Sequence, residues 1–86
     1  MSNTAYFITD NLSFVASAIL DGRVGIKKVV FHPNKQGVKN YYLSPFDLAN
    51  QVYLDYISDR IKVSPAQLSA KISEIKHLRA ERNLNV

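Results

Sequence analysis

The pattern of hydrophobic and polar positions begins with a short β-forming run and then takes on a helical period. Residues 4–9 are rich in β-forming side chains and predict a first strand. Apolar side chains at positions 12–19 recur at spacings of three and four residues, which predicts a helix ending near residue 20. Asp10 or Asn11 is suited to cap its start, and Gly22 to end it. Because this helix is apolar around most of its circumference, we expect it in the centre of the fold.

The next segment has the pattern of a β-hairpin. Strands are expected at residues 26–32 and 38–43, joined by a loop that contains the turn formers Pro33 and Gly37. Side chains alternate between the two faces of a strand, so a shift of one residue in the register would exchange the faces. The side chains expected in the core are Val29, Phe31, Tyr41 and Leu43. Those expected on the opposite face are Lys28, Val30, His32, Asn40 and Tyr42.

Two further helices are predicted, and each begins with a Ser-Pro pair. Ser44 and Ser64 are the expected N-caps, and the proline after each suits the first helical position. The last helix is expected to continue to about residue 83, with residues 83–86 frayed. The apolar stripes are Leu48, Ala49, Val52, Tyr56 and Ile57 on the first helix and Leu68, Ile72 and Ile75 on the second. The order β-α-β-β-α-α predicts a single small α+β domain, residues 1–86, with an antiparallel sheet packed against helices.

The positive charge of the chain is concentrated in one segment. The formal net charge is +4, yet no acidic residue occurs between Asp21 and Asp47. The basic residues of that segment are Arg23, Lys27, Lys28, Lys35 and Lys39. The other six basic residues are balanced by seven acidic ones, so the excess lies in the predicted hairpin and just before it. Such a local excess attracts anionic partners.

Composition narrows the classes of protein to consider. The chain contains no cysteine, which excludes a disulfide scaffold, a thiol nucleophile and cysteine-ligated metal sites. A domain of this size must therefore be held by packing, helped in some cases by self-association. No apolar run is long enough to span a bilayer, and the N-terminus lacks the pattern of a signal peptide. We expect no membrane partner and a cytoplasmic location, in the host cytoplasm if the protein is phage-encoded.

Motifs for catalysis are missing from the sequence. It has no phosphate-binding glycine loop, no nucleophile elbow and no HExxH pattern, so we expect a non-enzyme without cofactor or metal. His32 and His77 are far apart, and His32, just before a proline, is interpreted as a surface or capping histidine. Asp55 and Asp59 are spaced by one helical turn. Basic residues follow them closely, and we interpret the pair as part of a solvated helix face.

Two stretches resemble a short domain family of unknown function found in prokaryotic and phage genomes. TDNLSFVASAILDG resembles the opening of that family, and VSPAQLSAKISEIKHL resembles its closing helix. The matching residues are Thr9, Leu12, Phe14, Val15, Ala16 and Gly22 in the first and Val63, Pro65, Leu68, Ile72, Glu74, Ile75 and Lys76 in the second. Asn11 stands where the family has Asp, and Ser73 replaces a common Lys. The resemblance implies a small α+β unit carried by phages, and it supplies neither an activity nor catalytic residues.

The hairpin carries the remaining candidate chemistry. Single-stranded nucleic acids bind where basic side chains follow phosphates and aromatic rings stack on bases. The candidate binding residues are Lys27, Lys28, His32, Lys35, Lys39 and Tyr42. One hypothesis is a phage- or mobile-element-type accessory protein that binds nucleic acid through residues 23–42.

Three other interpretations remain open at this point. The basic segment of a protein-binding inhibitor of a host defence system, such as an anti-CRISPR or another anti-defence factor, could dock on an acidic or nucleic-acid-binding protein surface. The hairpin edge could instead pair with its own copy in a homodimer. Lysines on an edge strand also discourage aggregation, which requires no ligand at all.

Overall fold

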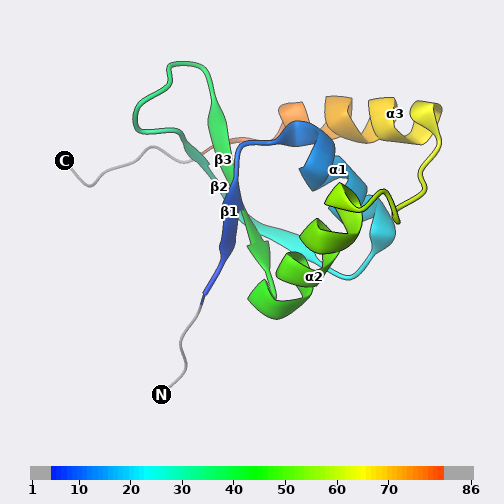
Figure 1. The fold of residues 1–86 in the computed structure, drawn as a ribbon. Coiled ribbons are helices and arrows are strands. Elements are labelled where there is room, and N and C mark those ends of the chain that lie inside the picture. The colour runs from blue at the N-terminus through cyan, green and yellow to red at the C-terminus, as the bar shows by residue number, and fades with distance from the viewer. Residues whose placement is uncertain (1–4, 81–86) are drawn as a thin grey trace.

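The computed structural model describes residues 5–80 and contains three strands and three helices in that range (Figure 1). The strands are β1 (Phe7–Thr9), β2 (Gly25–Phe31) and β3 (Lys39–Ser44). The helices are α1 (Leu12–Asp21), α2 (Phe46–Ile57) and α3 (Pro65–Lys76). This order confirms the predicted β-α-β-β-α-α arrangement and the α+β fold class.

The strands form one antiparallel sheet in the order β1-β3-β2, with β3 in the centre. All three helices lie on the same side of this sheet, to its right in Figure 1. We call the face that packs against the helices the inner face and the opposite one the outer face. Within residues 5–80, no helix covers the outer face.

Helix α1 occupies the centre of the hydrophobic core. Its residues 14–18 are buried one after another, as the apolar circumference of this helix predicts. It packs against both other helices and against β2. Val29, Tyr41 and Leu43 extend from the inner face of the sheet into the same core, which confirms three of the four predicted core positions of the hairpin.

A β-bulge at Lys27 adjusts the register of β2. Ile26 pairs with Leu43, whereas Lys28 already pairs with Tyr42, so Lys27 is an extra residue between two consecutive pairs. Without an extra residue, Ile26 and Val29 would face opposite sides of the sheet. The bulge allows both to pack on the core while Lys28 points outward.

Two of the three helices begin with the N-cap residue that the sequence predicts. Asn11 caps α1 by accepting a hydrogen bond from the Phe14 amide, and Ser64 caps α3 in the same way. Gly22 ends α1 in the left-handed conformation, with φ of 94°. The predicted Ser44 cap is wrong. Ser44 is the last residue of β3, paired with Gly25, so α2 begins only after Pro45 and has no side-chain cap.

Some residues predicted to face the core are exposed, and two predicted elements are shorter than expected. Phe31 is 42% exposed because it pairs with Lys39 at the loop end of the hairpin, which extends away from the helices in Figure 1. Leu48 and Ile57 lie on the flanks of α2 and are 41% and 58% exposed. Helix α3 ends at Lys76, short of the expected residue 83, which lies outside the described residues. The first strand is shorter than expected, and residue 4 also lies outside the described range.

Candidate nucleic-acid interface

Tyr42 lies at the middle of the outer face. It pairs directly with Ile8 of β1 on one side and with Lys28 of β2 on the other. The Lys28 ammonium is 4.9 Å from the centroid of the Tyr42 ring, a cation–π geometry. Tyr6 packs its ring edge-to-face with that of Tyr42, with 5.6 Å between centroids. An aromatic ring with a cation above it and a second ring beside it is therefore present on a sheet face that no described helix covers.

Other residues of the three strands point to the same side of the sheet as Tyr42 and make up the rest of the outer face. Its side chains are Tyr6, Ile8, Lys28, Val30, Asn40 and Tyr42. Lys27 lies exposed at the bulge beside it. Within residues 5–80, neither Lys27 nor Lys28 forms an ion pair, so both charges can attract an anion.

Lys39, also a predicted binding residue, serves a different role on the inner side of the sheet. Its Nζ donates hydrogen bonds to the carbonyl oxygens of Lys76 and Leu78, both at 2.9 Å. These carbonyls lie at the C-terminal end of α3, where a cation is stabilised by the helix dipole. Lys39 therefore links the hairpin to α3 and lies apart from Tyr42.

The other two predicted binding residues of the hairpin belong to its loop. His32 Nδ1 accepts hydrogen bonds from the amides of Asn34 and Lys35, at 3.0 and 3.1 Å. This confirms the interpretation of His32 as a capping residue. Lys35 Nζ lies 3.2 Å from a carboxylate oxygen of Asp10, in an exposed ion pair. The structure thus separates the six predicted residues into an outer-face pair, a bulge lysine, two loop residues and a helix-capping lysine.

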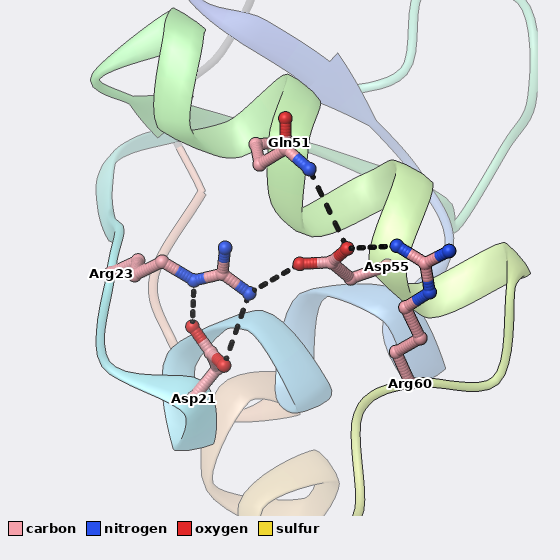
Figure 2. A network of polar contacts seen from close by, with 5 residues as sticks. All are labelled: Asp21, Arg23, Gln51, Asp55 and Arg60. Atoms are coloured by element: carbon pink, nitrogen blue, oxygen red, sulfur yellow. Dashed lines mark hydrogen bonds and ion pairs between the residues drawn. The ribbon is translucent and has the colours of Figure 1, made fainter.

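Arg23, the first basic residue of the segment, is held by carboxylates (Figure 2). Its guanidinium lies 2.6 Å from Asp21 Oδ2 and 2.8 Å from Asp55 Oδ2, joining the end of α1 to α2. Hydrogen bonding from Arg23 holds the pKa of Asp21 below its ordinary value, and the two carboxylates raise the pKa of Arg23. This guanidinium binds two helices together and is not directed at the outer face.

The interpretation of Asp55 and Asp59 as one solvated helix face is corrected. The Asp55 side chain is only 16% exposed and also contacts Gln51 and Arg60 (Figure 2). Asp59 follows the end of α2, with a positive φ of 59°, and its side chain is 94% exposed. The two carboxylates differ because Arg23 reaches Asp55 from 32 residues earlier in the chain, a contact that helical spacing cannot reveal.

A hollow of about 370 Å³ lies on the helix side of the hairpin. It is lined by Asp10, Leu12, Gly37, Val38, Lys39, Tyr41 and Lys76. Its charges are mixed, and Lys39 is already bound to the end of α3. Burial raises the pKa of the Tyr41 phenol, which favours its neutral form. The aromatic ring of this hollow, Tyr41, is buried, whereas Tyr42 on the outer face is half-buried and lies beneath the Lys28 ammonium.

Tyr6 and Ile8 are the members of the outer face that sequence reasoning missed. Their signal is the alternation in residues 6–9, where Phe7 and Thr9 take the inner positions. That alternation does not reveal that β1 pairs with β3, so it could not place Tyr6 beside Tyr42.

Comparison of the chain with protein families, with curated proteins and with solved structures finds no match. The resemblance to a phage-borne domain family therefore stays a prediction. In the part of the chain that the structure describes, no helix is long and apolar enough to cross a membrane. Among the same residues, no three histidine or carboxylate side chains are grouped as metal ligands.

Proposed function

We propose that this protein binds single-stranded nucleic acid on its outer face. On binding, the Lys28 ammonium moves from the Tyr42 ring to a flanking phosphate and a base stacks on that ring. Lys27 contacts another phosphate, and Tyr6 supports the Tyr42 ring. The observation that supports this proposal is the Lys28 ammonium held 4.9 Å from the Tyr42 ring on a face that no described helix covers.

The chemistry of the face favours unpaired bases over a duplex. Stacking on an aromatic ring needs the flat side of a base, which a duplex keeps inside its stack. The surface around Tyr42 is the outer face of a three-stranded sheet, and within residues 5–80 no helix lies on it. Few cations surround the ring, so the stacking contact must supply much of the affinity.

The proposal is tested by fluorescence anisotropy with labelled single-stranded DNA and RNA of about 12 nucleotides, a length within the site sizes of sheet-based binders. A DNA duplex of the same sequence is titrated in parallel, at low and moderate salt. Tyr42→Ala is expected to weaken single-strand binding roughly tenfold, as loss of one stacked base does. Lys27→Glu combined with Lys28→Glu is expected to remove detectable binding.

A charge-matched control is available at Lys62. Its side chain is 80% exposed and pairs only with the neighbouring Asp59 among the described residues, away from the sheet. Lys62→Glu is expected to bind as tightly as the wild type. Equal weakening by Lys62→Glu and by the outer-face variants would show that net charge alone causes binding, which contradicts the proposal.

The titration also separates this proposal from a protein-binding role. If the wild-type protein binds none of the oligonucleotides at low salt, the proposal of nucleic-acid binding is overturned. An inhibitor of a host defence system would instead form a stoichiometric complex with one host protein. Loss of that complex in Tyr42→Ala would assign the outer face to a protein partner.

A further inference from the structure

The two edges of the sheet differ in how well they are protected against pairing. Edge strand β2 carries a bulge at Lys27 and two adjacent lysines, devices that discourage strand addition. Edge strand β1 consists of Phe7, Ile8 and Thr9, without a charge, a proline or a bulge. Its outward backbone groups are uncommitted to another described strand, because β1 pairs only with β3. Sequence analysis left self-pairing of the hairpin edge as one open possibility, whereas the described edge strand that lacks such protection is β1.

An apolar stripe of α2 continues the surface of this edge. Phe46, Tyr53 and Ile57 lie on one side of α2, separated by seven and four residues. The Phe7 ring of β1 packs against the rings of Phe46 and Tyr53, with centroid distances of 6.2 and 5.4 Å. Phe46 remains 40% exposed and Ile57 58% exposed. Phe7 therefore connects the edge strand to a side of α2 on which the apolar side chains of Phe46 and Ile57 are exposed.

We propose that a second copy of this chain covers that surface, with the two β1 strands paired antiparallel about a twofold axis at Ile8. In this register Ile8 lies opposite Ile8 of the second copy on the outer face, and Phe7 lies opposite its Thr9 on the inner face. The α2 stripes then approach each other on the helix side of the joined sheet. Because the symmetry operation is twofold, the contact closes as a dimer.

The distribution of charge favours dimerisation through β1 over dimerisation through β2. A chain with a net charge of +4 repels its copy, so contact is favoured where both surfaces are uncharged. Pairing through β2 would place the lysines of the two copies together, and like charges directly opposite are destabilising. Pairing through β1 joins only Phe, Ile and Thr side chains. It also covers Ile8, which is 52% exposed in the single chain.

The dimer would enlarge the proposed binding surface, a consequence that rests on the proposed function. The strand order becomes β2-β3-β1-β1-β3-β2, so both outer faces lie on one sheet of six strands. The two Tyr42 rings then lie on the two β3 strands, nearer the centre of the joined sheet, and the two Lys28 side chains lie on the β2 strands at its edges. One strand of nucleic acid could then contact both copies.

The absence of cysteine from the chain gives a direct test of the proposed axis. In Ile8→Cys, the two thiols would face each other across an antiparallel pair, at a Cα separation that a disulfide spans. Mild oxidation is expected to convert this variant into a covalent dimer in high yield. Gln36→Cys, in the exposed β2–β3 loop, serves as the matched control and is expected to stay largely monomeric under the same conditions.

Sedimentation velocity over a concentration series tests the contact without any nucleic acid. The wild type is expected to move from monomer to dimer, and Ile8→Lys and Ile57→Glu are each expected to remain monomeric. Gln36→Lys adds the same charge as Ile8→Lys and is expected to dimerise like the wild type. A wild type that stays monomeric to millimolar concentration would overturn the proposal, as would a dimer that both variants leave intact.

These results are independent of those for nucleic-acid binding. A monomer that still binds oligonucleotides would contradict the dimer alone. A dimer that binds none would contradict the proposed function alone.

Discussion

Tyr41 and Tyr42 are neighbours on the central strand, and they show how one residue type serves two faces of the same sheet. Tyr41 is 2% exposed and packs in the core, where burial raises the pKa of its phenol. Tyr42 points the other way, beneath the Lys28 ammonium and beside the Tyr6 ring. The difference follows from strand alternation alone, since the two residues share their strand and their side-chain chemistry.

The lysines of the hairpin differ in the same way. Lys39 lies on the inner side and donates to two carbonyl oxygens at the end of α3, so it contributes to stability. Lys28 lies on the outer face, where its described partner is an aromatic ring. A high local density of lysine in the sequence therefore overstates the charge that the outer face offers to a ligand.

The largest expected effect contrasts the two tyrosines in stability. Tyr41→Ala removes a buried aromatic ring and is expected to lower the free energy of unfolding by about 3–5 kcal/mol. Tyr42→Ala removes a partly exposed ring and is expected to cost less than about 1 kcal/mol. Denaturant unfolding followed by circular dichroism measures both. Equal losses of stability would contradict the assignment of the two faces.

The next contrast uses the two lysines. Lys28→Met is expected to weaken oligonucleotide binding and to reduce the slope of log affinity against log salt by about 0.7, the share of one phosphate contact with a single strand. Lys39→Met is expected to leave that slope unchanged. It is expected to lower the free energy of unfolding by about 0.5–1 kcal/mol, because the hydrogen bonds to the carbonyl oxygens at the end of α3 are lost. Salt-dependent anisotropy and denaturant unfolding report the two effects separately. A larger change of slope in Lys39→Met would place the ligand on the inner side.

A smaller effect concerns the carboxylates around Arg23. The pKa of Asp21 is lowered in the folded protein, mainly by hydrogen bonding from Arg23, so the folded state binds fewer protons than the unfolded state near pH 4. The resulting stability is present above the unfolded pKa of about 3.9 and is lost as the pH falls through the lower folded value.

In Asp21→Asn, the free energy of unfolding is expected to decrease less steeply as the pH falls through that range. Oligonucleotide binding at neutral pH is expected to stay unchanged. Denaturant unfolding at a series of pH values from neutral to strongly acidic provides the measurement. An unchanged acid dependence would show that the Arg23 contact contributes nothing measurable at this exposed site.

Local chemistry in the sequence was sufficient for much of the fold. The caps at Asn11 and Ser64 and the glycine that ends α1 were predictable because each acts within a few residues. The alternation of the hairpin placed Tyr41 and Tyr42 on opposite faces. Ser44 was misassigned because a serine before proline is compatible both with a helix cap and with the last residue of a strand.

The distribution of charge was not predictable, because it depends on contacts between distant segments. Lys39 reaches carbonyls 37 and 39 residues later, and Arg23 reaches Asp55 across 32 residues. The bulge at Lys27 also escaped prediction, since only the pairing with β3 reveals the extra residue. Of the six candidate residues, the structure therefore places Lys28 and Tyr42 on the outer face and Lys27 beside it, and it adds Tyr6 and Ile8 to that face.

The most direct test of binding on the outer face is a titration of ¹⁵N-labelled protein with unlabelled single-stranded oligonucleotide, followed by two-dimensional NMR. Binding on this face predicts that the largest amide shift changes occur at Ile8, Lys28 and Tyr42, with little change in α1 and α2. Changes centred on Lys39 and Lys76, or none at saturating oligonucleotide, would contradict it.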